Sequence, residues 1–502
     1  MTASLNAARR ARELESLSRE PIDVLVIGGG VTGAGVALDA AARGLSVVLA
    51  EKHDLAFGTS RWSSKLVHGG LRYLASGAID IAHESAVERG ILIDHTAPHL
   101  VAPFPQVVPL LPQVNRRHAA LVRTGFLAGD ALRAAAHTSH HTLPRSRRIT
   151  GAQVQRFAPT VRTSGLRGGL LAWDGQLYDD ARLTVGIART AASLGARVLT
   201  RCAGEQVTGS GAVLRDHLSG DSYNVDARVV INAAGVWAGQ VASGVELRPS
   251  RGTHLVLSQD SFGGLTAGLT VPVPGSTSRF VFALPAPDNR VYVGITDEDA
   301  TGEIPDVPLA TEEEIDFLLE TVSSALRSPL TRADLLGTFS GLRPLLHTGG
   351  GNTADISRRH AVITAPDGLV TIVGGKLTTY RRMAEDTLDA ALAACGISAA
   401  PCSTRRLPLV GAASRDVLAT LVAPARLVRK YGTEAVVIAR DTGRAEVICE
   451  GTETTTAELR FAVQHEGALD EDDLLDRRTR IGLDPATRAR ALEAARAALS
   501  SP

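Results

Sequence analysis

The chain has 502 residues, of which 53 are basic and 53 acidic, so its formal net charge is zero. At roughly 150 residues per domain, this length predicts about three structural units. A nucleic-acid-binding protein should show a basic excess or a basic stripe, so the balanced charge argues against nucleic acid as a partner. A hydrophobic fraction of 44% is ordinary for a globular protein with a large core and excludes a largely disordered chain.

The cysteines and the N-terminal segment indicate the compartment. The four cysteines form no Cys-x-x-Cys pair and no Cys/His ligand spacing, which argues against a zinc or iron–sulfur site and favours free thiols in a reducing compartment. The N-terminal arginines are followed by Glu13, Glu15 and Glu20 without an apolar core, unlike a signal or transit peptide. The longest uncharged apolar stretch, residues 24–38, is too short to span a bilayer. We expect a cytoplasmic protein, soluble or peripheral on the inner face of the cell membrane.

The first hundred residues follow a β-turn-α-turn-β order. After a charged helix expected over residues 3–20, the β-branched run 23–27 predicts a strand that stops at three glycines. Residues 31–43 predict an Ala-rich helix that ends at Gly44, and residues 45–50 predict the next strand. This order is typical of a parallel sheet covered by helices.

The remaining chain alternates in character. Five prolines between residues 98 and 112 exclude a regular helix there. Residues 114–133 predict an amphipathic helix with Val114, Leu121 and Leu132 on one face; packing on its own domain is favoured over the alternative, contact with a membrane surface. Further elements are expected as strands at 228–231 and 370–373, antiparallel strands within 271–295, a helix at 377–395, and mainly helices after residue 408.

The first chemical signal is a Gly-x-Gly-x-x-Gly turn formed by Gly28, Gly30 and Gly33 between the first strand and its helix. Such glycines allow a tight turn and close approach of a pyrophosphate to the helix N-terminus. Glu51, at the end of the second strand, is placed to accept a hydrogen bond from a ribose hydroxyl. The pattern predicts dinucleotide binding, against the alternative of a glycine-rich structural turn.

Two later segments concentrate donors. Residues 59–73 carry hydroxyls, a lysine, a histidine, two glycines and an arginine, which suits a polar heterocycle with an anion beyond it; the alternative is a polar loop that caps a helix. Residues 374–381 again place glycines before a helix, where Lys376 could reinforce the helix N-terminus beside a flavin or reach the substrate. The alternative there is a second glycine-rich turn without a ligand.

Three histidines, His137, His140 and His141, raise the question of a metal. No carboxylate or cysteine accompanies them, so an ordinary loop is favoured and no metal site is predicted.

Several of these strings together resemble the FAD-dependent glycerol-3-phosphate dehydrogenase family, of the aerobic, quinone-linked kind. The matching segments follow the family's order and include Ser63-Ser-Lys-Leu-Val-His-Gly-Gly-Leu-Arg-Tyr73 and Gly374-Gly-Lys-Leu-Thr-Thr-Tyr-Arg381, with residues 26–35, 179–183, 232–235, 251–254, 341–344 and 457–480. The sequence departs from the family at Ala75, at Ala234 and over residues 113–150.

The resemblance implies an α/β architecture. A Rossmann-type FAD-binding domain is interleaved with an antiparallel-sheet (α+β) substrate domain in a core of residues 20–400. The FAD-binding parts are expected at about 20–100, 165–250 and 340–400, and the substrate-binding parts at about 101–164 and 251–339. A C-terminal helical domain is expected at residues 401–502.

The resemblance implies FAD as the cofactor, bound without a covalent link, although His68 is the position at which a link would be sought. The residues implied to hold FAD come from the glycine turn, the second strand and the two donor-rich segments: Gly28, Gly30, Val31, Thr32, Gly33, Glu51, Lys52, Thr59, Ser60, Ser63, Ser64, Lys65, His68, Gly69, Gly70, Ala234, Gly235, Gly375, Lys376, Leu377 and Thr378.

The implied reaction is oxidation of sn-glycerol 3-phosphate to dihydroxyacetone phosphate by hydride transfer to FAD, with electrons passed to a membrane quinone. Arg72, Tyr73, Arg343 and Lys376 are the candidates for binding the phosphate. His254 is the preferred base because imidazole titrates near working pH, while Arg343 would stabilise the developing alkoxide and Lys376 would assist. Without the resemblance, a hydrogen-bonded core histidine would be the favoured interpretation of His254, and Arg343 could equally be an ion-pair partner of a buried acid.

Three other functions are weighed. A glycerol-3-phosphate oxidase would pass the electrons to dioxygen, and an amino-acid or sarcosine oxidase would need fewer cations than Arg72, Arg343 and Lys376 provide. A non-catalytic dinucleotide-binding protein would have no use for His254. A homodimer is compatible with all of them.

Overall fold

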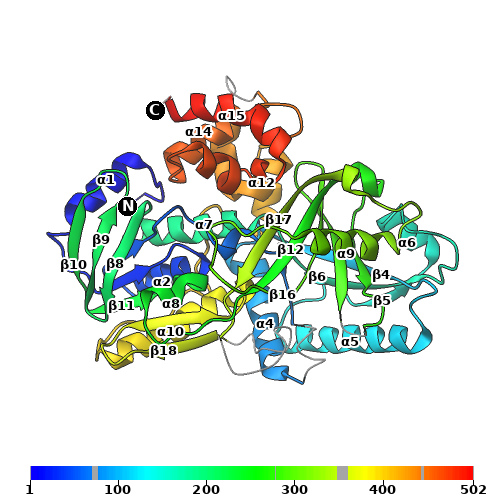
Figure 1. The fold of residues 1–502 in the computed structure, drawn as a ribbon, viewed down its shortest axis with the longest axis horizontal. Coiled ribbons are helices and arrows are strands. Elements are labelled where there is room, and N and C mark those ends of the chain that lie inside the picture. Colours follow the sequence, from blue (N-terminus) through cyan, green and yellow to red (C-terminus); the bar gives the residue numbers. More distant parts are fainter. Residues whose placement is uncertain (1, 71–76, 277–278, 347–359, 442–445, 501–502) are drawn as a thin grey trace.

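Two β-sheets and a helical C-terminal domain organise the molecule (Figure 1). The structure is a computed structural model and describes residues 2–70, 77–276, 279–346, 360–441 and 446–500. The parallel sheet and the large mixed sheet lie on opposite sides of the view in Figure 1, and the C-terminal domain is seated above both.

The parallel sheet confirms the expected β-turn-α-turn-β unit. Its strands follow one another across the sheet in the order β18 (His360–Thr364), β19 (Val370–Gly374), β11 (Val229–Asn232), β1 (Val24–Ile27), β2 (Val47–Ala50) and β7 (Arg197–Leu199). All pairs are parallel except β18 with β19. Every residue of β1 is buried, as expected for a β-branched run in a sheet covered on both faces.

Each face of this sheet has its own cover. On one face, apolar side chains of β1 pack with helices α2 (Val31–Ala42), α7 (Asp180–Ser193) and α10 (Tyr380–Ala394). On the other face, β1 packs with a three-stranded sheet, β8 (Cys202–Thr208), β9 (Gly211–Asp216) and β10 (Ser222–Asp226), and with residues of helix α1 (Ala7–Ser16). The predicted helix end at Gly44 is confirmed by its φ of +83°.

The large sheet contains the antiparallel strands expected within residues 271–295. Its order is β16 (Glu298–Asp299), β12 (Ser250–Ser258), β15 (Arg290–Gly294), β14 (Phe280–Ala286), β13 (Gly268–Pro272), β4 (Val101–Pro109), β6 (Gly169–Leu177) and β3 (Leu66–Val67), with β17 (Leu335–Arg343) beside β12 and β5 (Arg147–Ile149) beside β6. The pair β13–β4 is parallel, so the sheet is mixed and not purely antiparallel. Strands β3 and β6 belong to this large sheet, although they come from segments predicted as FAD-binding parts. The chain therefore crosses between the two sheets more often than the predicted residue ranges imply.

The proline-rich stretch forms strand β4 and no helix. Pro103 and Pro105 pair with β6 on one side, while the pairing with β13 on the other side involves only Gln106 and Val107. Pro103 and Pro105 therefore lie outside the part of β4 that pairs with β13, so their missing N–H groups cost no hydrogen bond to that strand.

Helix α5 (Arg116–Ala135) confirms the helix predicted over residues 114–133, but its packed face differs from the expected one. Ala119, Val122 and Phe126 pack against a buried cluster that includes Val114. Leu121 is 56% exposed, so its predicted place on the packed face is wrong. The packed residues follow the i, i+3, i+7 spacing of one helix face, and Leu121 lies about 100° away from Val122.

The described part of the core also contains helices α4 (Ile79–Ile91), α6 (Gly151–Phe157), α8 (Ala238–Val241) and α9 (Glu312–Ser323). Helix α9 begins with a capping box between Thr311 and Glu314, which satisfies donors at its N-terminus.

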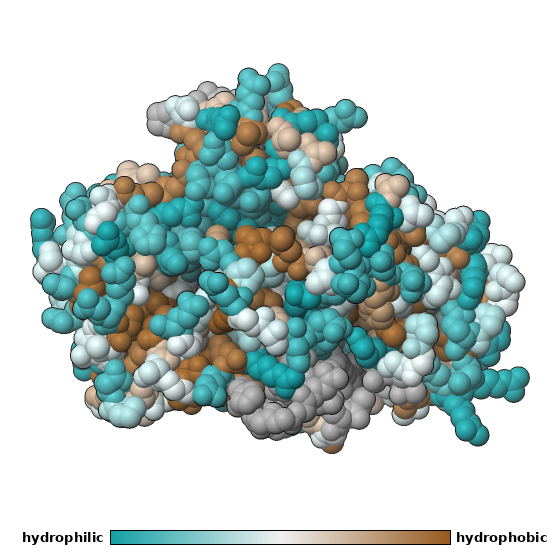
Figure 2. Space-filling view, in the orientation of Figure 1, coloured by the Kyte–Doolittle hydropathy of each residue, from teal (hydrophilic) through white to brown (hydrophobic). Residues whose placement is uncertain are grey.

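The C-terminal domain confirms the expected helical character after residue 408. Its helices are α11 (Arg415–Ala419), α12 (Ala425–Tyr431), α13 (Ala435–Arg440), α14 (Thr456–His465) and α15 (Pro485–Ser500). In Figure 2 its surface is largely hydrophilic, with apolar side chains scattered among polar ones. Within the described ranges, no helix is both long enough and apolar enough to cross a bilayer.

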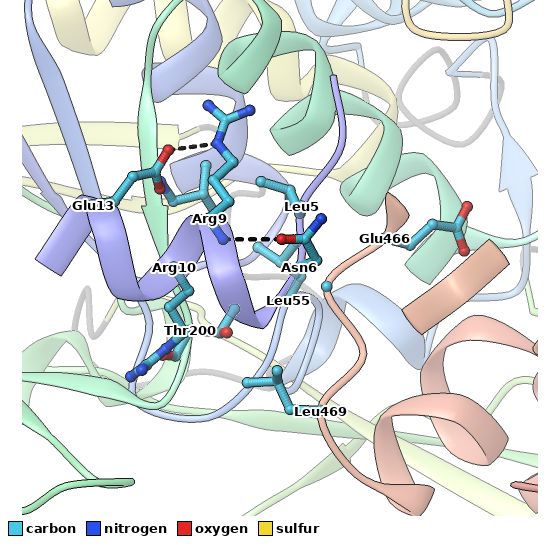
Figure 3. A pocket seen from close by; sticks show the side chains of 11 residues that line it. Leu5, Asn6, Arg9, Arg10, Glu13, Leu55, Thr200, Glu466 and Leu469 are labelled. Atoms are coloured by element: carbon cyan, nitrogen blue, oxygen red, sulfur yellow. Dashed lines mark hydrogen bonds and ion pairs between the residues drawn. The ribbon is translucent and has the colours of Figure 1, made fainter. Parts of the chain in front are cut away.

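Helix α1 contacts this domain and is shorter than the predicted helix over residues 3–20. Asn6 caps it by accepting a hydrogen bond from the Arg9 backbone N–H at 2.9 Å, and Leu5 pairs with the backbone beside Glu466. Figure 3 shows the small pocket between α1 and residues 466–469, with Arg9 bonded to Glu13 along the helix.

Candidate active site

The turn between β1 and α2 requires glycine at two positions. A Cβ on Gly28, whose φ is +111°, would lie 2.6 Å from the Ala233 carbonyl oxygen, and a Cβ on Gly33 would lie 1.9 Å from the Gly28 carbonyl oxygen. Gly30 is the N-cap of α2 and makes no side-chain capping bond. The result is a backbone cradle at a helix N-terminus, which suits the pyrophosphate of FAD.

The sheet topology places this cradle where ligands bind in such sheets. Strand β1 lies between β2, which follows it through α2, and β11, which comes much later in the chain. The carboxyl ends of these strands flank a topological switch point, the usual position of a dinucleotide. Ala234 and Gly235 follow β11 at this edge, where the Ala234 N–H donates to Asn232 Oδ1 at 3.2 Å.

Glu51, at the end of β2, already accepts two backbone hydrogen bonds. Its Oε2 accepts from the Gly29 N–H at 2.6 Å and its Oε1 from the His53 N–H at 2.8 Å. Burial raises the pKa of this carboxyl, and the two backbone donors act against that rise. A carboxylate has about four lone-pair sites, so Glu51 retains acceptor capacity for a ribose hydroxyl. Its neighbour Lys52 is exposed.

Residues 59–65, called the linking segment, connect the glycine cradle to a second polar group. Ser60 Oγ accepts from the Val31 N–H at 2.8 Å, which ties the segment to the start of α2. Thr59 Oγ1 donates to the Leu342 carbonyl on β17 at 2.6 Å. At its other end, Ser64 Oγ lies 2.9 Å from His254 Nε2. One short stretch of chain therefore spans the distance between the cradle and His254.

His254 is fully buried in β12 and stacks on Phe339 with ring centroids 4.6 Å apart. Its Nδ1 has no hydrogen-bond partner among the described residues. Burial lowers its pKa well below the ordinary value, and the charges of Lys65 and Arg343 lower it further. The imidazole is therefore neutral in the folded protein.

Lys65, predicted as a cofactor ligand, is the last residue of the linking segment, and its side chain is buried. Its Nζ donates to the Ser63 carbonyl at 3.0 Å and lies 3.2 Å from the carboxylate of Asp180. The same ammonium lies 4.5 Å from the centre of the Phe339 ring. Burial lowers the lysine pKa to about 8, although Asp180 acts in the opposite direction.

Arg343 ends β17 and has an acidic partner. Its Nη1 donates to Ser250 Oγ at 3.0 Å and lies 3.1 Å from Asp297 Oδ1, and its Nη2 donates to the Thr296 carbonyl at 3.2 Å. The ion pair proposed as its structural role is thus present. Its charge also reaches His254, so the two residues belong to one electrostatic group.

The second glycine-rich turn faces helix α4. Gly374 and Gly375 have φ values of +80° and +77°, and Lys376 follows them as the N-cap of a 3₁₀ turn, Leu377–Thr379, that opens α10. Lys376 Nζ donates to Ser85 Oγ on α4 at 2.6 Å. A residue with a Cβ at position 375 would meet Met383 Sδ at 2.4 Å.

The His68–Gly70 stretch is organised by an acid that sequence reasoning did not single out. Asp174 accepts from the Gly69 N–H at 3.1 Å, lies 3.4 Å from His68 Nδ1, and pairs with Arg89 at 2.7 Å. Burial acts to raise the pKa of Asp174, but the Arg89 charge and the His68 bond bring it below its usual value.

Some predicted residues lie outside these contacts. Arg72, Tyr73 and Ala75 fall outside the described residues. Thr378 is buried in the turn before α10. His140 and His141 have ring centroids 4.1 Å apart, and no group of three potential ligands that could hold a metal occurs in the described part of the chain.

The residues that sequence reasoning missed are mostly partners. Ser85, Asp174 and Asp297 hold Lys376, His68 and Arg343, and none of the three carries a local motif. Asp180 is the exception, because it lies in the Asp179–Leu183 string that matches the family.

Comparison with known proteins decides the family. The family described as FAD-dependent oxidoreductase matches residues 23–381, and the C-terminal domain of alpha-glycerophosphate oxidase matches residues 402–501. Glycerol-3-phosphate dehydrogenase 1 of Mycobacterium bovis is 56% identical, with 99% of each chain covered. The chain belongs to the FAD-dependent glycerol-3-phosphate dehydrogenase family.

More distant relatives agree with this membership. The mitochondrial glycerol-3-phosphate dehydrogenase of Arabidopsis thaliana is 34% identical over 98% of this chain and 85% of that protein. The crystal structure of the glycerol-3-phosphate dehydrogenase from Bacillus halodurans complexed with FAD has a TM-score of 0.74 at 27% identity, covering 99% and 94% of the two chains. The predicted fold class and FAD as the cofactor of this family member are confirmed.

Proposed function

We propose that this protein oxidises sn-glycerol 3-phosphate at C2 to dihydroxyacetone phosphate and passes the electrons to a membrane quinone. The observation that carries the proposal is the linking segment, which contacts the start of α2 through Ser60 and His254 through Ser64. A neutral, buried imidazole with the Arg343 charge in range is thereby connected to the cofactor cradle. The names of the relatives at 56% and 34% identity support the substrate.

In the proposed reaction, the C2 hydroxyl loses its proton to His254 while the C2 hydrogen leaves with its electron pair. FAD supplies, when bound, the two-electron acceptor for that hydrogen. Arg343 stabilises the developing alkoxide, since a fixed cation lowers the pKa of a nearby hydroxyl. Arg72, Tyr73, Arg343 and Lys376 hold the phosphate dianion, a role that suits guanidinium and ammonium donors.

Anaerobic mixing of the purified, FAD-loaded protein with glycerol 3-phosphate tests the substrate. We expect the yellow flavin colour to bleach on mixing and to stay unchanged with glycine or sarcosine. A flavin that is indifferent to glycerol 3-phosphate would contradict the proposal, and bleaching by the amino acids would favour an amino-acid oxidase.

Substitution of the two cations tests their roles. Arg343→Ala and Lys376→Ala should each retain FAD and lose turnover by about 100-fold or more, the scale of one lost charge-stabilising donor. Flavin absorbance per protein and the rate of anaerobic flavin bleaching are the measurements. Arg332→Ala, at an exposed ion pair on the large-sheet side, is the matched control and should leave the rate unchanged. Full activity in both test variants would refute their assignment.

The electron acceptor requires a separate measurement. Reoxidation by a soluble quinone that is faster than reoxidation by air, with little peroxide released, would support the quinone. Peroxide production that matches substrate turnover would instead identify a glycerol-3-phosphate oxidase.

The quinone proposal requires a peripheral contact with the inner face of the cell membrane by a cytoplasmic protein. Helix α5 supports this because Leu121 and Leu127, 56% and 50% exposed, lie among arginines on its outer side. Co-sedimentation with anionic vesicles should fall in a Leu121→Ser/Leu127→Ser variant. Unchanged sedimentation would exclude α5 as the contact.

A further inference from the structure

A small cavity lies between the core and the C-terminal domain, and neither His254 nor Arg343 is among its lining residues. It is lined by residues 178–179, by β15 and the turn before it, by α12, and by residues 479–480. We call it the interdomain cavity. Four cations line it, Arg290, Arg426, Lys430 and Arg480, together with the acids Asp179 and Asp288.

Three of the four cations have acidic partners. Arg426 and Lys430 both pair with Glu458, at 2.8 Å and 2.9 Å. Arg480 Nε lies 3.1 Å from Asp179 Oδ2. One carboxylate oxygen of Asp288, Oδ1, accepts from the C-terminal domain, from Thr452 Oγ1 at 3.1 Å and from the Glu453 N–H at 3.0 Å.

Arg290 is the exception. It is only 2% exposed, and its Nη1 donates to the Arg480 carbonyl at 2.8 Å. Its Nη2 has no hydrogen-bond partner, and no carboxylate of the described residues lies within ion-pair distance of its guanidinium. Asp484 feels the Arg290 charge, but its oxygens accept from Ala486 and Thr487. A guanidinium buried in this way is costly unless a counter-charge is near.

The charges and hydrogen-bond donors around the cavity indicate which kind of ligand it binds. The four cations are balanced in number by Asp179, Asp288, Glu458 and Asp484, but only Arg290 among them keeps a buried N–H without a partner. The other polar groups of the lining include Tyr178 and Tyr292, and burial raises the pKa of Tyr292 to about 12, so its hydroxyl remains a neutral donor. A small buried site with O–H donors and an unpartnered guanidinium N–H suits a small monovalent anion.

We propose that the interdomain cavity binds one monatomic anion of the chloride type against Arg290 Nη2. Such an anion neutralises the buried guanidinium and is held between elements of both domains, so its binding favours the docked arrangement. The effect extends to the linking segment, because Arg480, whose carbonyl accepts from Arg290, donates to the Arg61 carbonyl.

Bromide is the probe, since it replaces chloride and scatters X-rays anomalously. In crystals of the FAD-loaded wild-type protein grown with sodium bromide, we expect an anomalous peak within hydrogen-bonding distance of Arg290 Nη2. A water molecule there, with no anomalous signal, would overturn the proposal. This measurement needs no variant and is therefore independent of folding effects.

Thermal unfolding supplies the second measurement. At constant ionic strength, replacing gluconate, which is too large for the cavity, by chloride should raise the melting temperature of the holoenzyme. In Arg290→Leu the apparent dissociation constant for chloride should rise by about tenfold or more, so that this stabilisation is lost. Arg488→Leu, which removes an arginine from an exposed ion pair of the same domain, should keep it. An Arg290→Leu protein with the wild-type chloride response would contradict the proposal.

Discussion

The parallel sheet and the surface through which the C-terminal domain contacts the core, here called the docking surface, are both buried. Different interactions stabilise the two. Strands β1 and β2 are lined by fully buried aliphatic side chains such as Leu25 and Val48. The C-terminal domain is attached by buried ions: Arg477 and Arg478 pair with Asp54 at 2.6 Å and 2.7 Å, and Arg182 pairs with Glu466 through two hydrogen bonds.

The difference has an energetic consequence. Aliphatic burial stabilises in proportion to area, and a truncated side chain removes only its own share. A buried ion pair contributes little net stability over an apolar pair of the same shape, yet removing one partner leaves a charge without compensation. We therefore expect the sheet to tolerate small apolar changes and the docking surface to be sensitive to the loss of single charges.

The largest expected effect is a loss of FAD binding at the glycine cradle, where neither apolar burial nor ion pairing is involved and the space around the backbone is decisive. Gly33→Ala should abolish FAD binding, because its Cβ would lie 1.9 Å from the Gly28 carbonyl oxygen and displace the cradle. The ratio of flavin to protein absorbance measures this. Gly186→Ala in α7, where nothing lies within 4 Å of the added Cβ, should bind FAD normally. Equal FAD content in the two variants would contradict the role of the glycine cradle in FAD binding.

The next effect tests the docking surface directly. Asp54→Asn should destabilise the protein by about 3–5 kcal/mol, since it leaves the buried Arg478 without its carboxylate and Arg477 with Asp473 as its remaining buried acidic partner. Chemical denaturation of the holoenzyme measures the change in the free energy of unfolding. The matched control is Asp472→Asn, at an exposed pair with Arg488, for which the expected change is below about 1 kcal/mol. Similar losses in both variants would contradict the comparison.

Acid should weaken the docking surface more than the parallel sheet. The charges of arginines and a lysine outweigh burial and hold the pKa values of Glu466 and Glu458 at about 2, below the ordinary 4.5. Because these folded-state values are depressed, the stabilisation is complete above the unfolded-state pKa and is lost as the pH falls from about 4.5 towards 2. Denaturation midpoints measured downward from about pH 5 should fall steeply in the wild type and less in Glu466→Gln. A parallel decline in both proteins would refute the role of Glu466.

The smallest expected effect on the free energy of unfolding is at an exposed ion pair of the C-terminal domain. Arg496 pairs with Glu471 on the exposed side of the C-terminal domain, so Arg496→Ala should change the free energy of unfolding by less than about 0.5 kcal/mol. The same denaturation experiment measures it, and high salt should not alter the result. A loss as large as that of Asp54→Asn would mean that burial does not separate the two kinds of ion pair.

Features encoded in short stretches of chain were predictable. The β-branched run before Gly28, the helix after it and the C′ glycine at position 44 each follow from local backbone preferences. Leu121 shows where this fails, since the neighbouring elements decide which face of an amphipathic helix is packed. The predicted domain boundaries and site residues stay predictions that the proposed variants can test.

The sequence by itself determined the family, the dinucleotide turn and the order of strands and helices, because these depend on residues close together in the chain. Only the tertiary structure decided the partners. Ser64 meets His254, Asp54 meets Arg478, and Arg290 is buried without an acid, through contacts between segments far apart in sequence. Burial and charge compensation are properties of the folded surroundings of a side chain, and no local pattern of residues contains them.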